Sequence, residues 1–230
     1  SINQGQWIGG CIESVLTQGV CLHEVEHLVV DNCSTDETAT IVKRYPHVRF
    51  ISEPDRGQAH ALNKGFAMAC GEVICWLNAH DQYPQGTFAT VRSEIIERRR
   101  DVIFGKAKEI YFDSRPSRIL APRFKRREDL LRWWTKDVSI LQPAVFFTRE
   151  ACIRVGDLRE DLHVVMDLEY WWRMSAEYTF HFVDEVLAIQ QRQPESKTMT
   201  LIPRMYEEKR RVFHPLLNAT QPKRRLRNAM

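Results

Sequence analysis

The residues best suited to chemistry are Asn78, His80 and Asp81, which lie together in the segment LNAHD (77–81). They offer an amide, an imidazole and a carboxylate. Imidazole and carboxylate ligands together suit Mn²⁺ and related ions, whereas carboxylate ligands alone suit Mg²⁺. A polar loop that caps the next helix is the alternative interpretation, and Pro84 near a helix start favours it. The cluster alone leaves both interpretations open.

Other polar residues also follow short apolar runs. Asp31 and Asn32 come at the end of HLVVD (27–31), and Asp55 comes soon after VRFIS (48–52). Taken singly, such an acid is more simply a turn or helix-capping residue. Because ligands of α/β sheets bind beyond the carboxyl ends of the strands, however, these residues and LNAHD are candidates for one shared site.

The elements that would position these residues alternate along the first half of the chain. The pattern predicts helices at 7–18, 32–45, 59–70 and 84–100, and strands at 27–31, 48–52, 71–77 and 101–105. This order predicts an α/β fold with a mostly parallel sheet covered by helices on both faces. The strands are short and almost continuously apolar, as expected for a sheet buried on both sides.

The second half has a less regular pattern. It predicts an extended hairpin at 108–124, helices at 127–137 and 166–178, a strand followed by a short Gly156-capped helix at 140–156, two strand pieces at 178–193, and a helix from 203 with a basic tail. Its polar residues therefore cannot be assigned to one edge of a sheet from the pattern alone.

Composition restricts the class of protein. The chain has 230 residues, 43% of them hydrophobic, and a net charge of +3, which is too mild to indicate a nucleic-acid partner. The six cysteines show no metal-binding spacing, so we expect reduced packing residues of a cytoplasmic protein. No apolar run approaches the ~18 residues of a membrane span, and no signal peptide is visible.

The order of five segments resembles the family-2 glycosyltransferases of GT-A fold. These segments are NQGQWIGGCIESVLTQ, HLVVDNCSTDETATIVKRY, EPDRGQAHALNKGFAMACGEVICWLNAHD, QPAVFF and VMDLEYWWRM. The resemblance implies a Rossmann-like sheet with a smaller acceptor-side sheet, and a further strand ahead of Ser1. It also implies a single catalytic domain in three parts: a nucleotide-sugar half at 1–105, an acceptor and catalytic-base half at 106–200, and a basic helix and tail at 201–230.

The resemblance assigns the nucleotide-binding residues by position. The pair after the second strand of the family, which holds base and ribose, corresponds to Asp31 and Asn32. Asn32 can still donate to and accept from a base edge. The remaining candidates for the nucleotide and its diphosphate are Asn3, Asp55, Arg56 and Gln58.

The resemblance also assigns metal and base. The DXD-type motif of the family falls on residues 78–81, so Asp81 is the matched metal ligand and His80 stands where an aspartate is usual. The catalytic base corresponds to Asp167, which would deprotonate an acceptor hydroxyl for inverting attack on the anomeric carbon. By itself, Asp167 is more simply an N-terminal helix acid.

The chain departs from the family pattern at two places, of which the first bears on the metal. A histidine that is usual before an SKT-like segment is replaced by Gln193, and Lys106 stands where an acid is common. We hypothesise that His80 serves as a substitute metal ligand. The alternative is that metal binding is weakened and activity is low or lost.

The second half offers candidates for acceptor contact. Gln142 lies where the acceptor side of the family begins, and Trp171 could stack on a sugar ring. The tryptophan pairs at 133–134 and 171–172 are more often core residues. The basic residues Lys209, Arg210, Arg211, Lys223, Arg224, Arg225 and Arg227 are most simply a solvated face, with contact to anionic lipid as the alternative.

The sequence therefore predicts a metal-assisted, inverting transferase of a nucleotide-linked sugar. We expect a UDP-sugar donor, Mn²⁺ or Mg²⁺, and a saccharide or lipid-linked acceptor, as in cell-envelope polysaccharide synthesis. The expected location is the cytoplasm or the inner face of the plasma membrane. A nucleotidyltransferase and a non-catalytic sugar-nucleotide-binding protein remain the alternatives.

Overall fold

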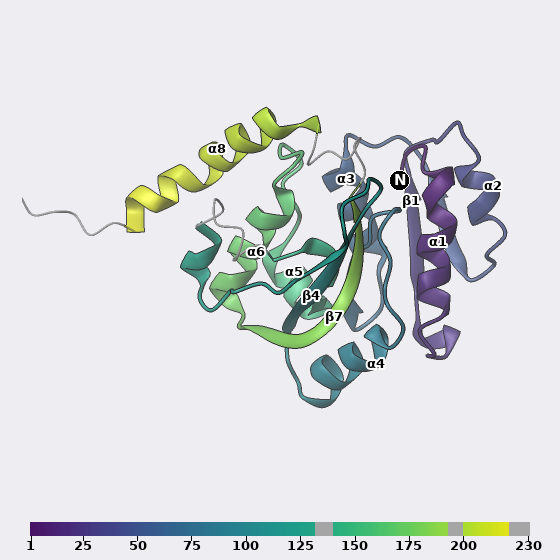
Figure 1. The fold of residues 1–230 in the computed structure, drawn as a ribbon, viewed down its shortest axis with the longest axis horizontal. Helices are drawn as coiled ribbons and strands as arrows, with labels where there is room; N and C mark the ends of the chain where they lie inside the picture. Colours follow the sequence, from purple (N-terminus) through teal and green to yellow (C-terminus); the bar gives the residue numbers. More distant parts are fainter. Residues whose placement is uncertain (132–139, 193–199, 221–230) are drawn as a thin grey trace, which may run out of the picture.

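The computed structural model describes residues 1–131, 140–192 and 200–220. Figure 1 shows helices and strands that alternate through the first half of the chain, as predicted. The helices are α1 (Gly5–Leu16), α2 (Thr38–Val42), α3 (Gln58–Met68), α4 (Thr87–Val91), α5 (Arg149–Val155), α6 (Met166–Glu177) and α8 (Ile202–Thr220). The strands are β1 (His27–Asp31), β2 (Val48–Ser52), β3 (Val73–Ile74), β4 (Val102–Tyr111), β5 (Arg118–Leu120), β6 (Val145–Thr148) and β7 (Phe180–Arg192).

The first two strands form a small parallel sheet. β1 and β2 occupy the residues predicted for them, and Asp31 lies opposite Ser52 at their carboxyl ends. α1 covers this sheet because its helically spaced Ile8 and Ile12 pack against Val29 of β1. Ser1 lies beside β1, where its carbonyl accepts the Asn32 N–H at 2.8 Å.

The remaining strands form a mixed sheet, not a mostly parallel one. β4 pairs with β7 in parallel, and β3–β6, β6–β4 and β4–β5 are antiparallel. The α/β class is confirmed, as is the hairpin expected near 108–124. The expectation of a mostly parallel sheet is wrong here, because β6 runs antiparallel to both β3 and β4 and a short loop joins β4 to β5 as a hairpin.

β4 and β7 form the long central pair of the molecule (Figure 1). β7 is one continuous strand where two pieces were expected, and its pairing with β4 shifts register around Lys106. Gly105 makes this close pairing possible, since a Cβ there would lie 2.5 Å from Cγ of Leu187. The expected division between residues 105 and 106 falls inside β4, and the three-part division of labour stays a prediction.

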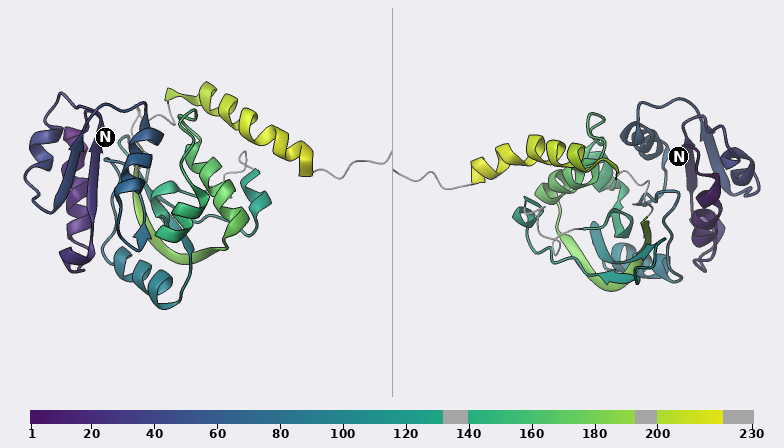
Figure 2. Two further views of the ribbon diagram at one scale, coloured as in Figure 1. Left: turned by 180° about the vertical axis from the view of Figure 1, so that it is seen from behind. Right: turned by 45° about the horizontal axis from the view of Figure 1, so that its top comes forward.

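Helices cover both sheets. Figure 2 shows α3 between the β1–β2 sheet and the larger sheet, and α8 along the opposite end of the molecule. The largest core cluster lies between β4, β6 and α6, and includes Phe104, Phe147 and Trp171. Trp172 of α6 contacts Phe213 of α8, with ring centroids 6.4 Å apart. Through this contact α8 packs against α6 and the core cluster.

The cysteines only partly follow the packing interpretation. All six are free thiols, of which Cys11 and Cys152 are buried and Cys75 is half-buried; Cys21, Cys33 and Cys70 are exposed. Across the described ranges, no helix combines the length and the apolar character needed to cross a bilayer.

Candidate active site

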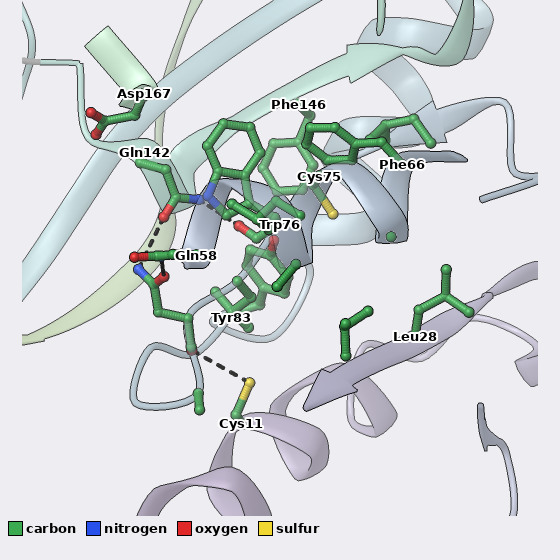
Figure 3. Close-up of a pocket in the computed structure, with 18 of the residues that line it drawn as sticks. Cys11, Leu28, Gln58, Phe66, Cys75, Trp76, Tyr83, Gln142, Phe146 and Asp167 are labelled. Atoms are coloured by element: carbon green, nitrogen blue, oxygen red, sulfur yellow. Dashed lines mark hydrogen bonds between the residues drawn. The ribbon is translucent and has the colours of Figure 1, made fainter. Parts of the chain in front are cut away.

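A large cavity is lined by several of the candidate residues. Its volume is about 1180 Å³. Figure 3 shows part of its lining: Leu28 of β1 and Phe66 of α3 belong to the apolar part, and Gln58, Gln142 and Asp167 to the polar part. The side chains that could do chemistry on its wall are Asn32, Asp55, Gln58, Asn78, His80, Gln142, Asp167, Arg192 and Lys209.

Asp31 supports this wall from behind. Its side chain is 0% exposed, and its carboxylate accepts hydrogen bonds from Ser1 Oγ, Ser52 Oγ, and both Oγ and the backbone N–H of Ser34. Burial acts to raise the pKa of Asp31, but these hydrogen bonds outweigh it and hold the pKa below its usual value. Asp31 therefore fixes the loop that carries Asn32.

Asn32 and Asp55 form the next layer toward the cavity. The side-chain oxygen Oδ1 of Asn32 accepts the backbone N–H of Asp55 at 2.8 Å, and the carboxylate of Asp55 accepts the backbone N–H of Gly57 at 2.8 Å. Gly57 has φ +131° and precedes α3, a conformation that favours glycine. These bonds place Asn32 and Asp55 next to each other, and both line the cavity together with Gln58; their nucleotide-binding roles stay predictions.

Asn3 and Arg56 lie farther from the cavity. Asn3 is exposed and accepts the backbone N–H of Thr35 at 2.9 Å. Arg56 is also exposed and pairs with Glu160 at 2.7 Å, which links the start of α3 to the loop before α6. The nucleotide-binding roles of both residues stay predictions.

Asn78 is the centre of the polar network. Its amide nitrogen donates to Asp81 and to Gln142, at 3.0 Å each, and its carbonyl oxygen accepts from Gln58 at 2.9 Å. Gln142 extends this network by donating a hydrogen bond from Nε2 to the backbone carbonyl of Trp76 (Figure 3). The amide that follows β3 thus connects α3, the segment before β6 and the candidate metal ligand.

Asp81 and His80 lie close together beside this network. His80 Nε2 is 3.7 Å from Asp81 Oδ1, and that oxygen also accepts the Gln191 N–H at 3.1 Å. Asp81 is 0% exposed. Burial raises its pKa, while His80 and the bond from Asn78 act in the opposite direction.

Asp167 is the second residue of α6 and lines the cavity, near Gln142 in Figure 3. Its Oδ1 accepts the N–H of Leu168 at 2.8 Å. Burial raises its pKa, opposed by that hydrogen bond and by the positive charge of Lys209. A carboxylate whose pKa is raised toward neutrality is better suited to accept a proton.

The two acceptor candidates have different positions. Gln142 is 8% exposed and belongs to the Asn78 network on the cavity wall. Trp171 is 0% exposed and stacks on Trp76, with ring centroids 5.1 Å apart. The expectation that Trp171 contacts an acceptor is therefore wrong: its ring faces the core because α6 is amphipathic, with its apolar side toward the sheet.

Sequence reasoning missed a buried carboxylate beside the site. Glu109 of β4 is 1% exposed and binds Arg192 of β7 at 2.8 Å, Arg118 of β5 at 2.6 Å and the Tyr111 hydroxyl at 2.7 Å. Burial acts to raise its pKa, but these partners lower it overall. Arg192 is thereby held at the cavity wall, close enough to lower the pKa of both Asp81 and Asp167.

Some candidates occupy other places. Lys106 pairs with Asp184 at 2.7 Å, and Arg211 pairs with Asp161 at 2.9 Å. Lys209 lies on the cavity wall and not on a basic surface. Gln193, Trp133, Trp134, Lys223, Arg224, Arg225 and Arg227 lie outside the described residues.

His80 and Asp81 provide a donor set that fits a divalent cation. An imidazole and a carboxylate 3.7 Å apart match the ligand chemistry of Mn²⁺. Within the described ranges, no group of three or more His, Cys, Asp or Glu side chains is placed to hold a metal ion. Of the two, His80 lines the cavity, whereas Asp81 is fully buried behind it.

Several known proteins are similar to this chain in sequence, at low identity. "Uncharacterized protein MT1568" of Mycobacterium tuberculosis is 26% identical over 215 residues, covering 85% of this chain and 66% of that protein. "Uncharacterized glycosyltransferase YibD" of Escherichia coli is 29% identical over 104 residues, covering 44% of this chain and 30% of that protein. The chain thus spans two thirds or less of the length of these relatives.

Solved structures share the fold. Staphylococcus aureus TarS (1–349) in complex with UDP superposes with a TM-score of 0.71 at 20% identity, covering 96% of this chain and 65% of that one. A mannosyltransferase from Pyrobaculum calidifontis, in complex with GDP-Man and Mn²⁺, superposes with a TM-score of 0.66 at 20% identity, covering 95% and 66%. These likenesses confirm the GT-A fold.

The sequence model of the family described as glycosyl transferase family 2 matches residues 1–156. This range contains β1 to β6, and with them the polar residues that follow β1, β2 and β3. It ends before α6, β7 and α8, which complete the cavity. The match extends over more than half of the chain, which therefore belongs to glycosyl transferase family 2.

Proposed function

We propose that this chain transfers a sugar from a nucleoside-diphosphate sugar to an acceptor hydroxyl, with inversion at the anomeric carbon. The observation that carries the proposal is the shared cavity of a family-2 fold, whose wall carries both the half-buried carboxylate of Asp167 and the polar network centred on Asn78. Inverting displacement requires the acceptor hydroxyl and its base on the face of the anomeric carbon opposite the departing diphosphate, and we place Asp167 on that face.

Asp167 would act as the general base. It takes the proton from the acceptor hydroxyl, whose oxygen forms a bond to the anomeric carbon as the bond from that carbon to the diphosphate oxygen breaks. The nucleoside diphosphate leaves with the electron pair. Burial raises the pKa of Asp167 and so increases its basicity.

Asn32, Asp55 and Gln58 would bind the nucleotide. They lie together at the carboxyl ends of β1 and β2 and the start of α3, where α/β folds bind ligands. TarS has been solved with UDP and with UDP-GlcNAc, and the Pyrobaculum enzyme with GDP-Man. We propose a UDP-sugar as donor for this chain.

His80 and Asp81 would hold a divalent cation. When bound there, Mn²⁺ or Mg²⁺ would neutralise charge on the departing diphosphate. Arg192, held at the cavity wall by Glu109, would add a fixed positive charge on the same side.

The acceptor would be a saccharide or a lipid-linked sugar. Two relatives are named for acceptors of these classes: the poly(ribitol-phosphate) β-N-acetylglucosaminyltransferase TarS, and a dolichyl-phosphate-sugar glucuronosyltransferase of Methanococcus voltae. Contact with an anionic membrane and a cytoplasmic location stay predictions. Of the basic residues in α8, Lys209 lines the cavity and Arg211 pairs with Asp161, and the basic tail lies outside the described residues.

A thermal-shift screen of nucleotide sugars, with and without Mn²⁺, tests the proposal. Binding to the native state raises Tm, by the equivalent of about 2.7 kcal/mol at a hundredfold excess over Kd. We expect one UDP-sugar to raise Tm more with Mn²⁺ than without it, and to release UDP when an acceptor is added. Failure of every nucleotide sugar to raise Tm would refute the proposal.

The metal assignment has a separate test. Calorimetry compares Mn²⁺-dependent UDP binding by the native chain and by His80→Asp, with His80→Ala as control. If His80 is a ligand, His80→Ala weakens binding and His80→Asp roughly restores the native affinity. A large gain in His80→Asp over the native chain would instead show that the native motif binds metal poorly.

A further inference from the structure

The C-terminal helix α8 contacts the site through a buried acid. Glu208 is 4% exposed, and its carboxylate accepts the backbone N–H groups of His163, Val164 and Val165 at distances of 2.9–3.3 Å. Arg204, one turn earlier, donates to the same carboxylate at 3.1 Å. Burial acts to raise the pKa of Glu208, but these hydrogen bonds lower it overall, which keeps the carboxylate ionised.

These three N–H groups immediately precede α6. A helix begins with N–H groups that have no partner within the helix, and a side chain near its first turn usually satisfies some of them. Val165 at the N-cap of α6 makes no side-chain cap hydrogen bond. Glu208 supplies an acceptor at this place from a different helix, two residues before Asp167.

The next residue of α8 lies on the cavity wall. Lys209 lines the same cavity as Asp167. Burial lowers the pKa of Lys209, whereas the charge of Asp167 raises it, and Lys209 reciprocally lowers the pKa of Asp167. The other ionisable groups on this part of the wall are Arg192 from β7, His163 from the loop before α6 and Asp129 from the 3₁₀ turn Arg127–Leu131.

We propose that α8 is part of the active site: Glu208 is a positioning residue that holds the start of α6, and Lys209 places a cation toward the Asp167 carboxylate. The role of Asp167 rests on the proposed function, but the contacts of Glu208 do not. Both residues lie beyond the range 1–156 that the family model matches, and the sequence alone suggested a basic, solvated face or contact with anionic lipid for this helix.

Amide hydrogen exchange of residues 163–168 tests the positioning role in the full 230-residue chain. The variants are Glu208→Ala and Glu208→Gln, with Glu207→Gln as control, since Glu207 is the exposed neighbour on α8. We expect exchange on the order of tenfold faster in Glu208→Ala. Glu208→Gln should give a smaller increase, because the Gln side chain still offers an acceptor oxygen, although a neutral and therefore weaker one.

The control variant should exchange as slowly as the native chain. Native-like exchange in Glu208→Ala overturns the positioning role. If that variant does not fold, native-like exchange in Glu208→Gln overturns it.

Carboxyl ¹³C NMR tests the role of Lys209 without turnover. The titration of Asp167, assigned from its loss in Asp167→Asn, is compared in the native chain, Lys209→Met and the control Arg210→Met. Removing a neighbouring positive charge favours the protonated acid, so Lys209→Met should raise the pKa of Asp167. An unchanged midpoint, or an equal rise in Arg210→Met, overturns the assignment.

Kinetics then connect the contacts to catalysis. With a donor identified by the thermal-shift screen, Glu208→Ala should lower kcat at least ~10-fold, with Kd for UDP within about twofold of native, because the nucleotide residues lie on other elements. Partial rescue in Glu208→Gln is expected, and an unchanged kcat overturns the catalytic part. If the native chain binds no nucleotide, the proposed function fails while the exchange and NMR results still decide the role of α8.

Discussion

The two walls of the cavity are held in different ways. One wall carries Asn32, Asp55 and Gln58 and is called the nucleotide wall after its proposed role; the other carries Asp167 and is called the base wall. Behind the nucleotide wall, Asp31 is bound by Ser34, three residues away, and by Ser1 and Ser52, all within the first quarter of the chain. On the base wall, the start of α6 is bound by Glu208, 43 to 45 residues later. The nucleotide wall is therefore built by its own segment of sequence, and the base wall needs a distant one.

Asp167→Asn is the strongest test of whether sugar transfer and nucleotide binding depend on different walls. This change removes the proposed base and leaves the Asn32–Asp55–Gln58 side intact. We expect sugar transfer to fall ~10²- to 10⁴-fold while calorimetry shows native affinity for UDP. Native turnover in Asp167→Asn would refute the base assignment, and loss of UDP binding would show that the walls are not independent.

Asp31→Ala should damage the nucleotide wall as a scaffold. The change removes a buried carboxylate that accepts four hydrogen bonds, so we expect about 2–4 kcal/mol less free energy of unfolding. Urea denaturation measures it, and Ser52→Ala, which removes one of the four bonds, is the control at about 1 kcal/mol. Equal losses in the two variants would mean that Asp31 does not organise the loop.

The amino end of β1 gives the same wall a pH dependence. His27 packs near His47, and its pKa is lowered to about 4 by burial first and then by that imidazole. The unfolded chain binds the proton at the ordinary pKa of 6.5, so stability should fall as the pH drops from 6.5 toward 4, and this contribution levels off below 4.

Denaturation at several pH values measures this loss, which we expect to be on the order of 3 kcal/mol. His27→Leu should remove that part of the dependence. An identical pH profile in the variant would show that other groups cause it.

Arg56→Ala should have the smallest effect. Its ion pair with Glu160 joins the two walls at the surface, with 68% of the Arg56 side chain exposed. Exposed pairs contribute about 0–1 kcal/mol, and salt screens them. A loss of stability well above this in thermal denaturation would show that the walls depend on this link.

The sequence predicted the nucleotide wall well because its signals are local. β1 and β2 occur at the predicted residues, and Asn32, Asp55 and Asn78 follow strand ends in chain order. The periodicity of α6 also placed Asp167 correctly in the first turn of its helix. The family match confirms the transferase class, while the site roles stay proposals.

The other features could not be predicted from local pattern. The antiparallel pairings of β4 depend on which strands meet across the sheet. The burial of Glu109 depends on Arg118 and Arg192 from two other strands. Glu208 lies between Glu207 and Lys209 in a charged helix, and periodicity gives no sign that its carboxylate reaches the start of α6. Trp171 was ambiguous because an aromatic residue at this spacing suits both a core and a sugar-binding face.

The bond between Glu208 and the start of α6 also sets an order of events during synthesis. A growing chain folds from its amino end as residues emerge from the ribosome. When residue 200 has emerged, the serines around Asp31 are all present, and Asp167 exists without the carboxylate that holds its helix start. The nascent protein can therefore assemble its nucleotide wall before it can fix its base, because α8 emerges later and supplies that carboxylate.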